Sequence, residues 1–161
     1  MNDSSPQLHD LPGAEQYLRA LPARMPEPLS LALATELAQD VDADALLVLA
    51  RRAGSRWAAQ LAPNFGQAQS MADLIDRLNT YWASMRWGWI SLEDHRDHLL
   101  LHHHLLPIAQ LYGSQSLRWT VGLVEGFYEE LFRLLGADDS VEVRVASETD
   151  DGLEVQFRVT A

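Results

Sequence analysis

Residues 141–160, VEVRVASETDDGLEVQFRVT, indicate the fold of this chain more directly than any other stretch. Apolar residues alternate with polar ones on both sides of an Asp-Asp-Gly sequence at 150–152, where Gly favours a tight turn. Strict alternation is the pattern of a strand with one buried and one solvated face. The stretch therefore predicts an antiparallel β-hairpin.

The charges on the solvated face of this hairpin favour one register. If Val143 pairs with Phe157, Glu142 lies opposite Arg158. A shift by two residues would place Arg144 opposite Arg158, and like charges directly across a sheet are destabilising. We therefore expect the Val143–Phe157 register.

A long helix is predicted before this hairpin, over residues 117–135. Its apolar stripe has helical spacing and consists of Leu117, Val121, Val124, Tyr128, Leu131 and Leu135. Gly136 is expected to end the helix. Gly122 and Gly126 lie one turn apart on another side of it. Because glycine costs about 1 kcal/mol relative to alanine inside a helix, we expect another backbone to pack closely there.

A second hairpin is expected between residues 87 and 106. Residues 87–92 alternate, with Trp87, Trp89 and Ser91 on one face, and residues 93–97 are polar. Residues 98–106 can return as a strand that Pro107 ends, or can form a helix, because a short apolar run is ambiguous by period. We favour the strand because the polar turn makes a hairpin with the preceding segment.

Three helices are predicted upstream of the hairpins. The first spans residues 29–38. The second follows Asp40, Asp42 and Asp44, which suit a helix N-terminus, and we expect Pro63 and Gly66 to end it. Its apolar stripe consists of Leu46, Leu49, Ala50, Ala53, Trp57 and Leu61, with Arg52, Arg56 and Gln60 on the opposite side.

The third helix is expected to begin after Ser70, which with Asp73 forms a variant of the capping box. Asp73 and Arg77 are four residues apart and can pair on its surface. Its apolar stripe consists of Met71, Leu74, Ile75, Leu78, Trp82 and Met85.

Together these elements predict an α+β fold, with N-terminal helices, a β-hairpin, a long helix and a C-terminal β-hairpin forming a four-stranded antiparallel sheet. The 161 residues suit one domain, which we place at residues 29–161. Residues 1–28 hold five of the seven prolines and are predicted to be an arm that orders on another surface; a solvated tail is the alternative. A short turn of helix fits residues 14–21, and the apolar anchors of the arm are Leu8, Leu11, Tyr17, Leu18 and Leu21.

Composition excludes several kinds of function. The net charge is −11, with 12 arginines and no lysine, so the surface repels nucleic acid and anionic membranes. No window is apolar enough for a membrane helix. The N-terminus lacks the positive charge and apolar run of a signal peptide, so we expect a cytoplasmic protein. Without cysteine, neither a disulfide nor a thiolate site can form.

Four histidines, at positions 98, 102, 103 and 104, are the obvious candidates for metal binding. On a strand His98, His102 and His104 would share a face, and imidazole is a common metal ligand. Their spacing matches no defined metal motif, and the nearby acids, Glu93, Asp94 and Asp97, lie in the turn. We therefore predict no metal and no cofactor, and interpret the histidines as a polar sheet face or a subunit contact.

No recognised catalytic motif is present. The sequence has no Gly-x-Ser-x-Gly elbow and no phosphate-binding loop. Glu129 and Glu130 are adjacent, and adjacent helix residues point in different directions. We therefore predict that the chain is not an enzyme and has no catalytic residues.

Five tryptophans are many for this length. Trp87 and Trp89 on one strand face could stack against sugar rings of a glucan. The alternative is that Trp57, Trp82 and one of these two belong to the core, where indole rings bury a large area.

Three segments resemble one family in order and spacing. Residues 85–93, MRWGWISLE, resemble the first hairpin of the D subunit of bacterial cellulose synthase, and His103 before Pro107 resembles the end of its second strand. The helix sequence LVEGFY at 123–128, followed by Leu-Gly-Ala at 135–137, is similar to its long helix. The resemblance covers roughly Asp73 to the C-terminus.

The resemblance implies a non-catalytic accessory subunit of cellulose export. Members are understood to form an octameric ring whose passages guide β-1,4-glucan chains, and to act with other synthase subunits and a Pro-rich scaffold partner. The family has been placed in the periplasm as well as the cytoplasm. Its sugar contacts come mainly from the N-terminal region, where residues 1–28 match nothing, so no glucan-binding residue is transferred.

Two other functions compete. The order helix, Leu135-Gly136, hairpin also resembles the 4-vinyl-reductase-type ligand-sensing domain, which would make the chain a small-molecule sensor; the lack of cysteine argues against a metal-sensing version. A glucan hydrolase would need two carboxylates about 5–10 Å apart across a groove, and the sequence places none.

Overall fold

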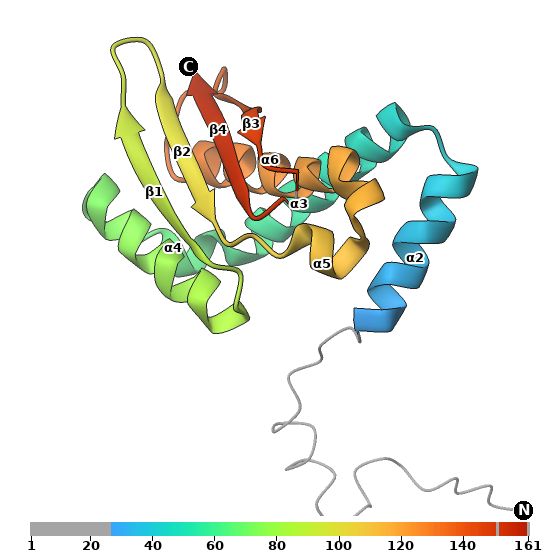
Figure 1. The fold of residues 1–161 in the computed structure, drawn as a ribbon. Coiled ribbons are helices and arrows are strands. Elements are labelled where there is room, and N and C mark those ends of the chain that lie inside the picture. Colours follow the sequence, from blue (N-terminus) through green and yellow to red (C-terminus); the bar gives the residue numbers. More distant parts are fainter. Residues whose placement is uncertain (1–26, 151, 161) are drawn as a thin grey trace, which may run out of the picture.

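The computed structural model describes residues 27–150 and 152–160, which form helices packed on one side of a four-stranded sheet (Figure 1). The helices are α2 (Glu27–Asp40), α3 (Ala43–Phe65), α4 (Met71–Met85), α5 (Ile108–Tyr112) and α6 (Leu117–Leu134), with a 3-10 turn η2 (Ser114–Ser116). The strands are β1 (Trp89–Asp94), β2 (Leu99–His104), β3 (Glu142–Glu148) and β4 (Glu154–Thr160). The predicted α+β class and order of elements are confirmed, while α5 and η2 were not predicted. The proposed arm lies, apart from its last two residues, outside the described residues.

The predicted helix starts are confirmed by their caps. The Asp42 carboxylate accepts hydrogen bonds from the backbone N–H groups of Asp44 and Ala45 at the start of α3. Ser70 accepts from the Asp73 N–H at the start of α4, and Asp73 pairs with Arg77 at 2.9 Å.

The predicted end of α3 is confirmed at Gly66 but was wrong for Pro63. The helix continues through Pro63 to Phe65, and Gly66 follows as its C-cap. The side chain of Phe65 is buried in the core, and the Gly66 N–H donates to the Ala62 carbonyl. These contacts keep the last turn helical although Pro63 donates no hydrogen bond.

Helices α3 and α6 pack with their backbones in close contact. A methyl group on Gly126 of α6 would overlap the Arg51 carbonyl, and one on Gly54 of α3 would overlap the Leu123 carbonyl. A methyl group on Gly122 would meet the Leu47 side chain at 2.5 Å. The close packing predicted from the α6 glycines is confirmed.

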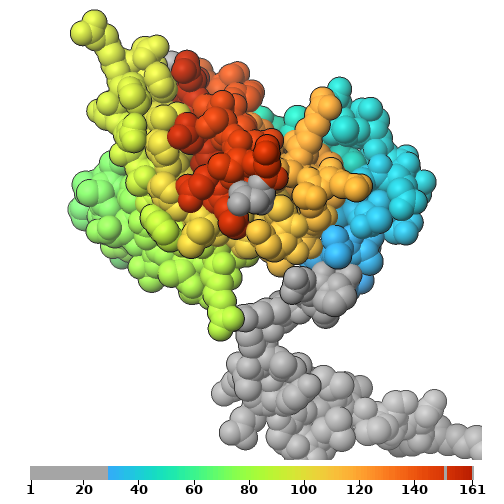
Figure 2. Space-filling model, viewed as in Figure 1, coloured from blue at the N-terminus to red at the C-terminus, as the bar shows by residue number. Residues whose placement is uncertain are grey.

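The sheet has the order β1-β2-β4-β3, with every neighbouring pair antiparallel. The two hairpins therefore join through β2 and β4, where Leu101 lies opposite Phe157. Strands β1, β2 and β4 face the viewer in Figures 1 and 2, and no helix of the described residues covers them on that side.

The predicted register of the β3–β4 hairpin was wrong by two residues. Val143 lies opposite Val159, and Arg144 lies opposite Arg158. The repulsion expected there is relieved because Arg144 pairs with Glu129 of α6 at 2.8 Å and with Glu142 at 3.5 Å. A bulge between Val145 and Ser147 then shifts the pairing toward the turn. The prediction considered only the charges of the two strands and therefore missed the Glu129 carboxylate on α6.

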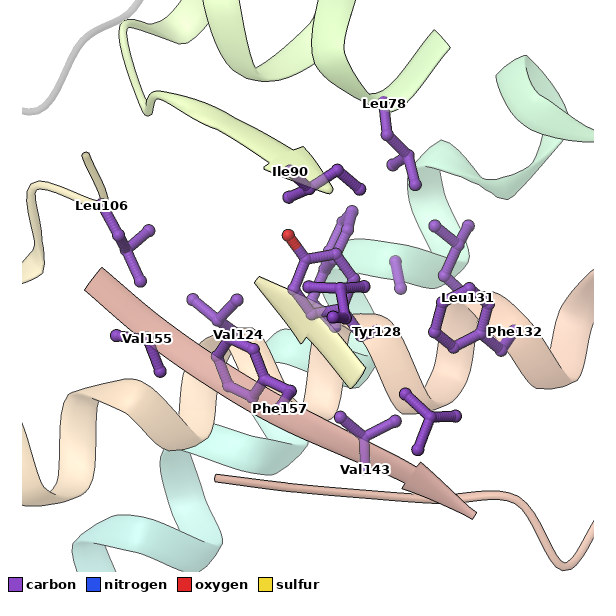
Figure 3. Close-up of a cluster of buried hydrophobic side chains, with 14 of the residues drawn as sticks. Leu78, Ile90, Leu106, Val124, Tyr128, Leu131, Phe132, Val143, Val155 and Phe157 are labelled. Carbon is purple, nitrogen blue, oxygen red and sulfur yellow. The ribbon is translucent and has the colours of Figure 1, made fainter. Parts of the chain in front are cut away.

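The core lies between α6 and the inner face of the sheet (Figure 3). Tyr128 of α6 packs on Phe157 of β4 with 5.5 Å between ring centroids, and Leu131 of α6, Leu78 of α4 and Ile90 of β1 belong to the same cluster. All five side chains are at most 2% exposed. This packing holds the two hairpins in one sheet, because both pack against the same helix.

We predict that Gly126→Ala destabilises the fold by about 1–3 kcal/mol, because the added methyl group forces α3 and α6 apart. Urea unfolding followed by circular dichroism measures the effect. Gly66→Ala is the matched control, since its backbone is ordinary right-handed helix and its new methyl group would meet nothing closer than 3.7 Å. Equal stability of the two variants would contradict the close-contact interpretation.

Candidate functional site

The outer face of the sheet carries a short stack of aromatic rings. Trp89 of β1 stacks on His104 of β2 at 5.2 Å between ring centroids, and His104 stacks on His102 at 5.9 Å. Two neighbours fix the His104 ring: its Nδ1 lies 2.6 Å from the Glu154 carboxylate and its Nε2 lies 3.1 Å from the Ser91 hydroxyl. The result is a polar face with one large exposed indole.

The histidines do not gather around one point. His98 lies in the β1–β2 loop, where its ring stacks on His95 and its Nδ1 is 2.8 Å from the Asp97 carboxylate. His102 Nε2 is 3.3 Å from Glu93, within ion-pair distance but not aligned as a hydrogen bond. Among residues 27–150 and 152–160, no three His, Asp or Glu side chains are placed to hold a metal ion.

Trp87 and Trp89, one of two possibilities that the sequence left open for a sugar-binding pair, do not share a face. Gly88 adopts a positive φ of 72°, which interrupts the alternation before β1 begins. Trp87 therefore turns inward and stacks on Trp82 at 5.8 Å, while Trp57 meets both rings edge-on. Trp89, which is 48% exposed, lies on the outer face without Trp87. The alternative, that Trp57, Trp82 and one of the pair belong to the core, is confirmed.

His103 is buried in the core and joins β2 to α6 and to the turn between α4 and β1. Its Nε2 is 2.6 Å from the Trp87 carbonyl, and its Nδ1 is 2.8 Å from the Tyr128 hydroxyl. A carbonyl only accepts, so Nε2 carries the proton, and the neutral ring then accepts from Tyr128 at Nδ1. Burial disfavours the charged ring and lowers the His103 pKa to about 4. In the sequence, only its position on the inward side of β2 distinguishes this histidine from His102 and His104.

Two carboxylates on α6 hold the outer edge of β3. Glu125 accepts from the Val145 N–H at 2.7 Å, and Glu129 accepts from the Val143 N–H at 3.0 Å. Arg51 of α3 binds both carboxylates at 2.9 Å. Burial alone would raise the Glu129 pKa, but the Val143 N–H and the neighbouring arginines lower it.

These carboxylates have structural partners and are not arranged as an acid–base pair. Glu125 and Glu129 are one helical turn apart, and no catalytic motif in the sequence marks this spacing. The adjacent residues Glu129 and Glu130 separate as expected, because Glu130 points elsewhere and pairs with Arg133.

The opposite edge of the sheet, at β1, is bound by an amide side chain. Asn79 of α4 accepts from the Ile90 N–H at 2.6 Å and donates to the Ile90 carbonyl at 3.0 Å. The side chain thus replaces the peptide group of a neighbouring strand at this position.

An apolar surface lies around α2, which projects from the rest of the described chain (Figure 1). Leu29, Leu31 and Leu33 of α2 are 43–50% exposed. Between α2, α3 and α6 runs a groove of about 220 Å³, called here the α2–α3 groove, lined by Ser30, Leu33, Ala34, Leu37, Leu49, Ala50, Ala53, Tyr112, Trp119, Thr120 and Leu123. Leu49 and Ala53 belong to the apolar stripe predicted for α3, yet both are exposed. Arg52, Arg56 and Gln60, predicted on the opposite side of the helix, line the same hollow as these two residues, so that part of the prediction was wrong. The buried side of α3 is shifted and contains Leu46, Ala50, Gly54, Ala58 and Phe65.

The fold is similar to that of a protein of known structure. Trafficking protein particle complex subunit 3 from Naegleria fowleri, solved covalently bound to palmitic acid, matches with a TM-score of 0.61 and 13% sequence identity. The match covers 83% of this chain and 93% of the other. At this identity the likeness shows a common fold. A search of curated proteins found no match.

A family model defines the chain more closely. The model for the D subunit of cellulose synthase matches residues 14–160, nearly the whole sequence. The chain therefore belongs to the family of cellulose synthase D subunits, as its hairpin and long-helix motifs indicated. Membership gives it a role in cellulose synthesis as an accessory subunit that acts with other components of the synthase. None of the helices in the described part of the chain has the length and apolar character needed to cross a membrane.

The His103 site generates a prediction about pH. The folded pKa of about 4 lies below the ordinary value of 6.5, so the unfolded chain binds the proton first as the pH falls. The stability contribution is complete above pH 6.5 and is lost as the pH falls toward 4, by roughly 3 kcal/mol in total.

Urea unfolding at several pH values, on wild type and His103→Gln, measures this effect. All other titratable groups are the same in both proteins, so the difference between the two curves isolates His103. We expect the wild type to lose more stability between pH 6.5 and 4 than the variant. Parallel curves would show that His103 does not remain neutral in the folded state.

Proposed function

We propose that this chain is a non-catalytic scaffold subunit of cellulose synthesis that assembles into a closed ring, an octamer, through its helical surface. The family match supports the role in cellulose synthesis. The apolar surface of α2 is the observation that supports assembly, because a helix that is apolar on several sides is normally buried.

The exposed leucines of α2 are distributed around the helix. Leu29 and Leu33 lie on one side, and Leu31 lies roughly opposite, so packing α2 on its own domain leaves one group uncovered. Large apolar surfaces on a soluble domain mark sites of protein contact. In a closed ring every copy covers the same surface of its neighbour, which makes the assembly finite.

The ring is proposed to organise synthase complexes or to guide β-1,4-glucan chains, together with other synthase subunits and a Pro-rich scaffold partner. Glucan is uncharged, so the net charge of −11 does not repel it as it would an anionic polymer. We assign no residue to glucan binding. A cytoplasmic location remains our prediction, with the periplasm as the alternative.

A small-molecule sensor is the second candidate. The α2–α3 groove favours it, because the groove is almost entirely apolar and the protein of similar fold is bound to palmitic acid. This chain has no cysteine and cannot form a thioester with an acyl chain. A sensor of this type would hold its ligand non-covalently and would not need a ring.

Native mass spectrometry of the purified full-length chain distinguishes the two. We expect a single closed species of eight copies at micromolar concentration. A monomer would overturn the ring, whereas a dimer carrying an extracted hydrophobic molecule would favour the sensor.

We also predict that the protein does not turn over substrate. Cello-oligosaccharides and simple ester and phosphoester substrates are incubated with the protein and analysed by chromatography. Product formation that tracks with the protein through a second purification would contradict the non-catalytic role.

A further inference from the structure

The α2–α3 groove lacks an occupant among the described residues. Leu33 and Leu49 on its two sides are 47% and 52% exposed. The Trp119 indole N–H, in the lining of the groove, is buried and has no hydrogen-bond partner in residues 27–150 and 152–160. An occupant that fits this groove therefore offers apolar side chains and at least one hydrogen-bond acceptor.

The groove continues along α3 into a second hollow of about 310 Å³. The continuation is lined by Leu49, Arg52, Ala53, Arg56, Trp57 and Gln60. Arg52 and Arg56 lie one helical turn apart, are exposed, and form no ion pair within the described residues. In a protein with a net charge of −11, two adjacent unpaired arginines beside an apolar groove favour an occupant with an acidic residue.

The chain itself contains a segment with these properties. Ala14, Tyr17, Leu18 and Leu21 follow the spacing i, i+3, i+4, i+7, which is the pattern of a helix that binds a groove through one apolar face. Glu15 supplies an acidic residue. Residues 1–28 offered no recognisable family motif, but the family model begins at residue 14, so this segment belongs to the part of the sequence that the family shares.

We propose that residues 14–21 of one copy bind in the α2–α3 groove of a neighbouring copy, with Glu15 facing Arg52 and Arg56. The segment is separated from the start of α2 by residues 22–26, which include Pro22 and Pro26. To enter its own groove it would have to reverse direction at once and run back along α2. Proline favours extended backbone both for itself and for the residue before it, so the sequence favours a neighbouring copy over the segment's own domain.

This inference deepens the proposed function, because it names the surface and the segment that join the copies. It requires contact between copies, whereas the ring requires closure as well. The two proposals can therefore fail separately. Native mass spectrometry tests the ring, and cross-linking tests the arm contact.

Cross-linking between introduced cysteines tests the arm contact. Because the chain has no cysteine of its own, only the introduced thiols react. Full-length Leu18→Cys and Ala53→Cys chains, carrying tags of different size, are co-expressed and treated with a short bismaleimide. We expect a cross-linked heterodimer. Pairing Leu18→Cys with Val48→Cys is the matched control, because Val48 is an exposed α3 residue that does not line the groove.

The outcomes separate the alternatives. Docking brings the two thiols together, so the heterodimer yield should exceed the control by about tenfold. If the double variant Leu18→Cys/Ala53→Cys cross-links only within one chain, the arm binds its own groove and the exchange between copies is wrong. If no groove-dependent cross-link forms in either arrangement, the groove belongs to another ligand and the proposal fails.

Charge reversal provides a second test that does not depend on cross-linking. Glu15→Arg should weaken the contact about two- to fivefold, the usual range for an exposed ion pair. Adding Arg52→Glu and Arg56→Glu should restore it, which a purely structural role of these residues would not. The dissociation constant from analytical ultracentrifugation measures both, and failure of the triple variant to recover would remove the proposed pairing.

Discussion

The close contact between α3 and α6 is the constraint on which the remaining structure depends. Gly54 and Gly126 let the two backbones touch, and this distance brings Arg51 of α3 within reach of Glu125 and Glu129 on α6. The same carboxylates take the β3 N–H groups and thus place the C-terminal hairpin on the helix. The two glycines therefore allow the helix contact, the helix contact allows the ion pairs, and the ion-paired carboxylates fix the position of β3.

Local patterns predicted most of the fold, and contacts between distant segments explain the errors. Alternation and caps predicted both hairpins and the helix starts, because these depend on residues close in sequence. The β3–β4 register was wrong because Glu129, 15 residues before Arg144 in the chain, neutralises the pair that repulsion seemed to exclude. The alternating pattern of residues 87–92 could not assign Trp87 to the core, because the backbone conformation of Gly88 determines the direction of the Trp87 side chain. The sequence did not distinguish His103 from the neighbouring histidines, because its hydrogen-bond partner Tyr128 is distant in sequence and is brought close only by the fold.

For the functional surfaces as well, local patterns were informative and contacts between elements were not predicted. The helical pattern placed Arg52, Arg56 and Gln60 opposite the apolar stripe of α3, and this was wrong. The structure gathers them with Leu49, Ala53 and Trp57 of that stripe around one hollow, where Leu49 and Ala53 are exposed. Residues that satisfy the pattern of a core and yet remain exposed are typical of a protein completed by contact with others. The proposed assembly of the chain, as an accessory subunit of cellulose synthesis, therefore rests on the α2–α3 groove and not on the histidines or the tryptophans.

The side chains that bind the sheet edges have a consequence for how such a protein survives at high concentration. An uncovered strand recruits strands from other molecules, and this is how aggregates and open-ended fibrils begin. Here Asn79 occupies β1 at Ile90, and Glu125 and Glu129 occupy β3 at Val145 and Val143. In the proposed ring, copies of the chain can then meet through their helices, while indefinite growth through their strands is blocked at these positions.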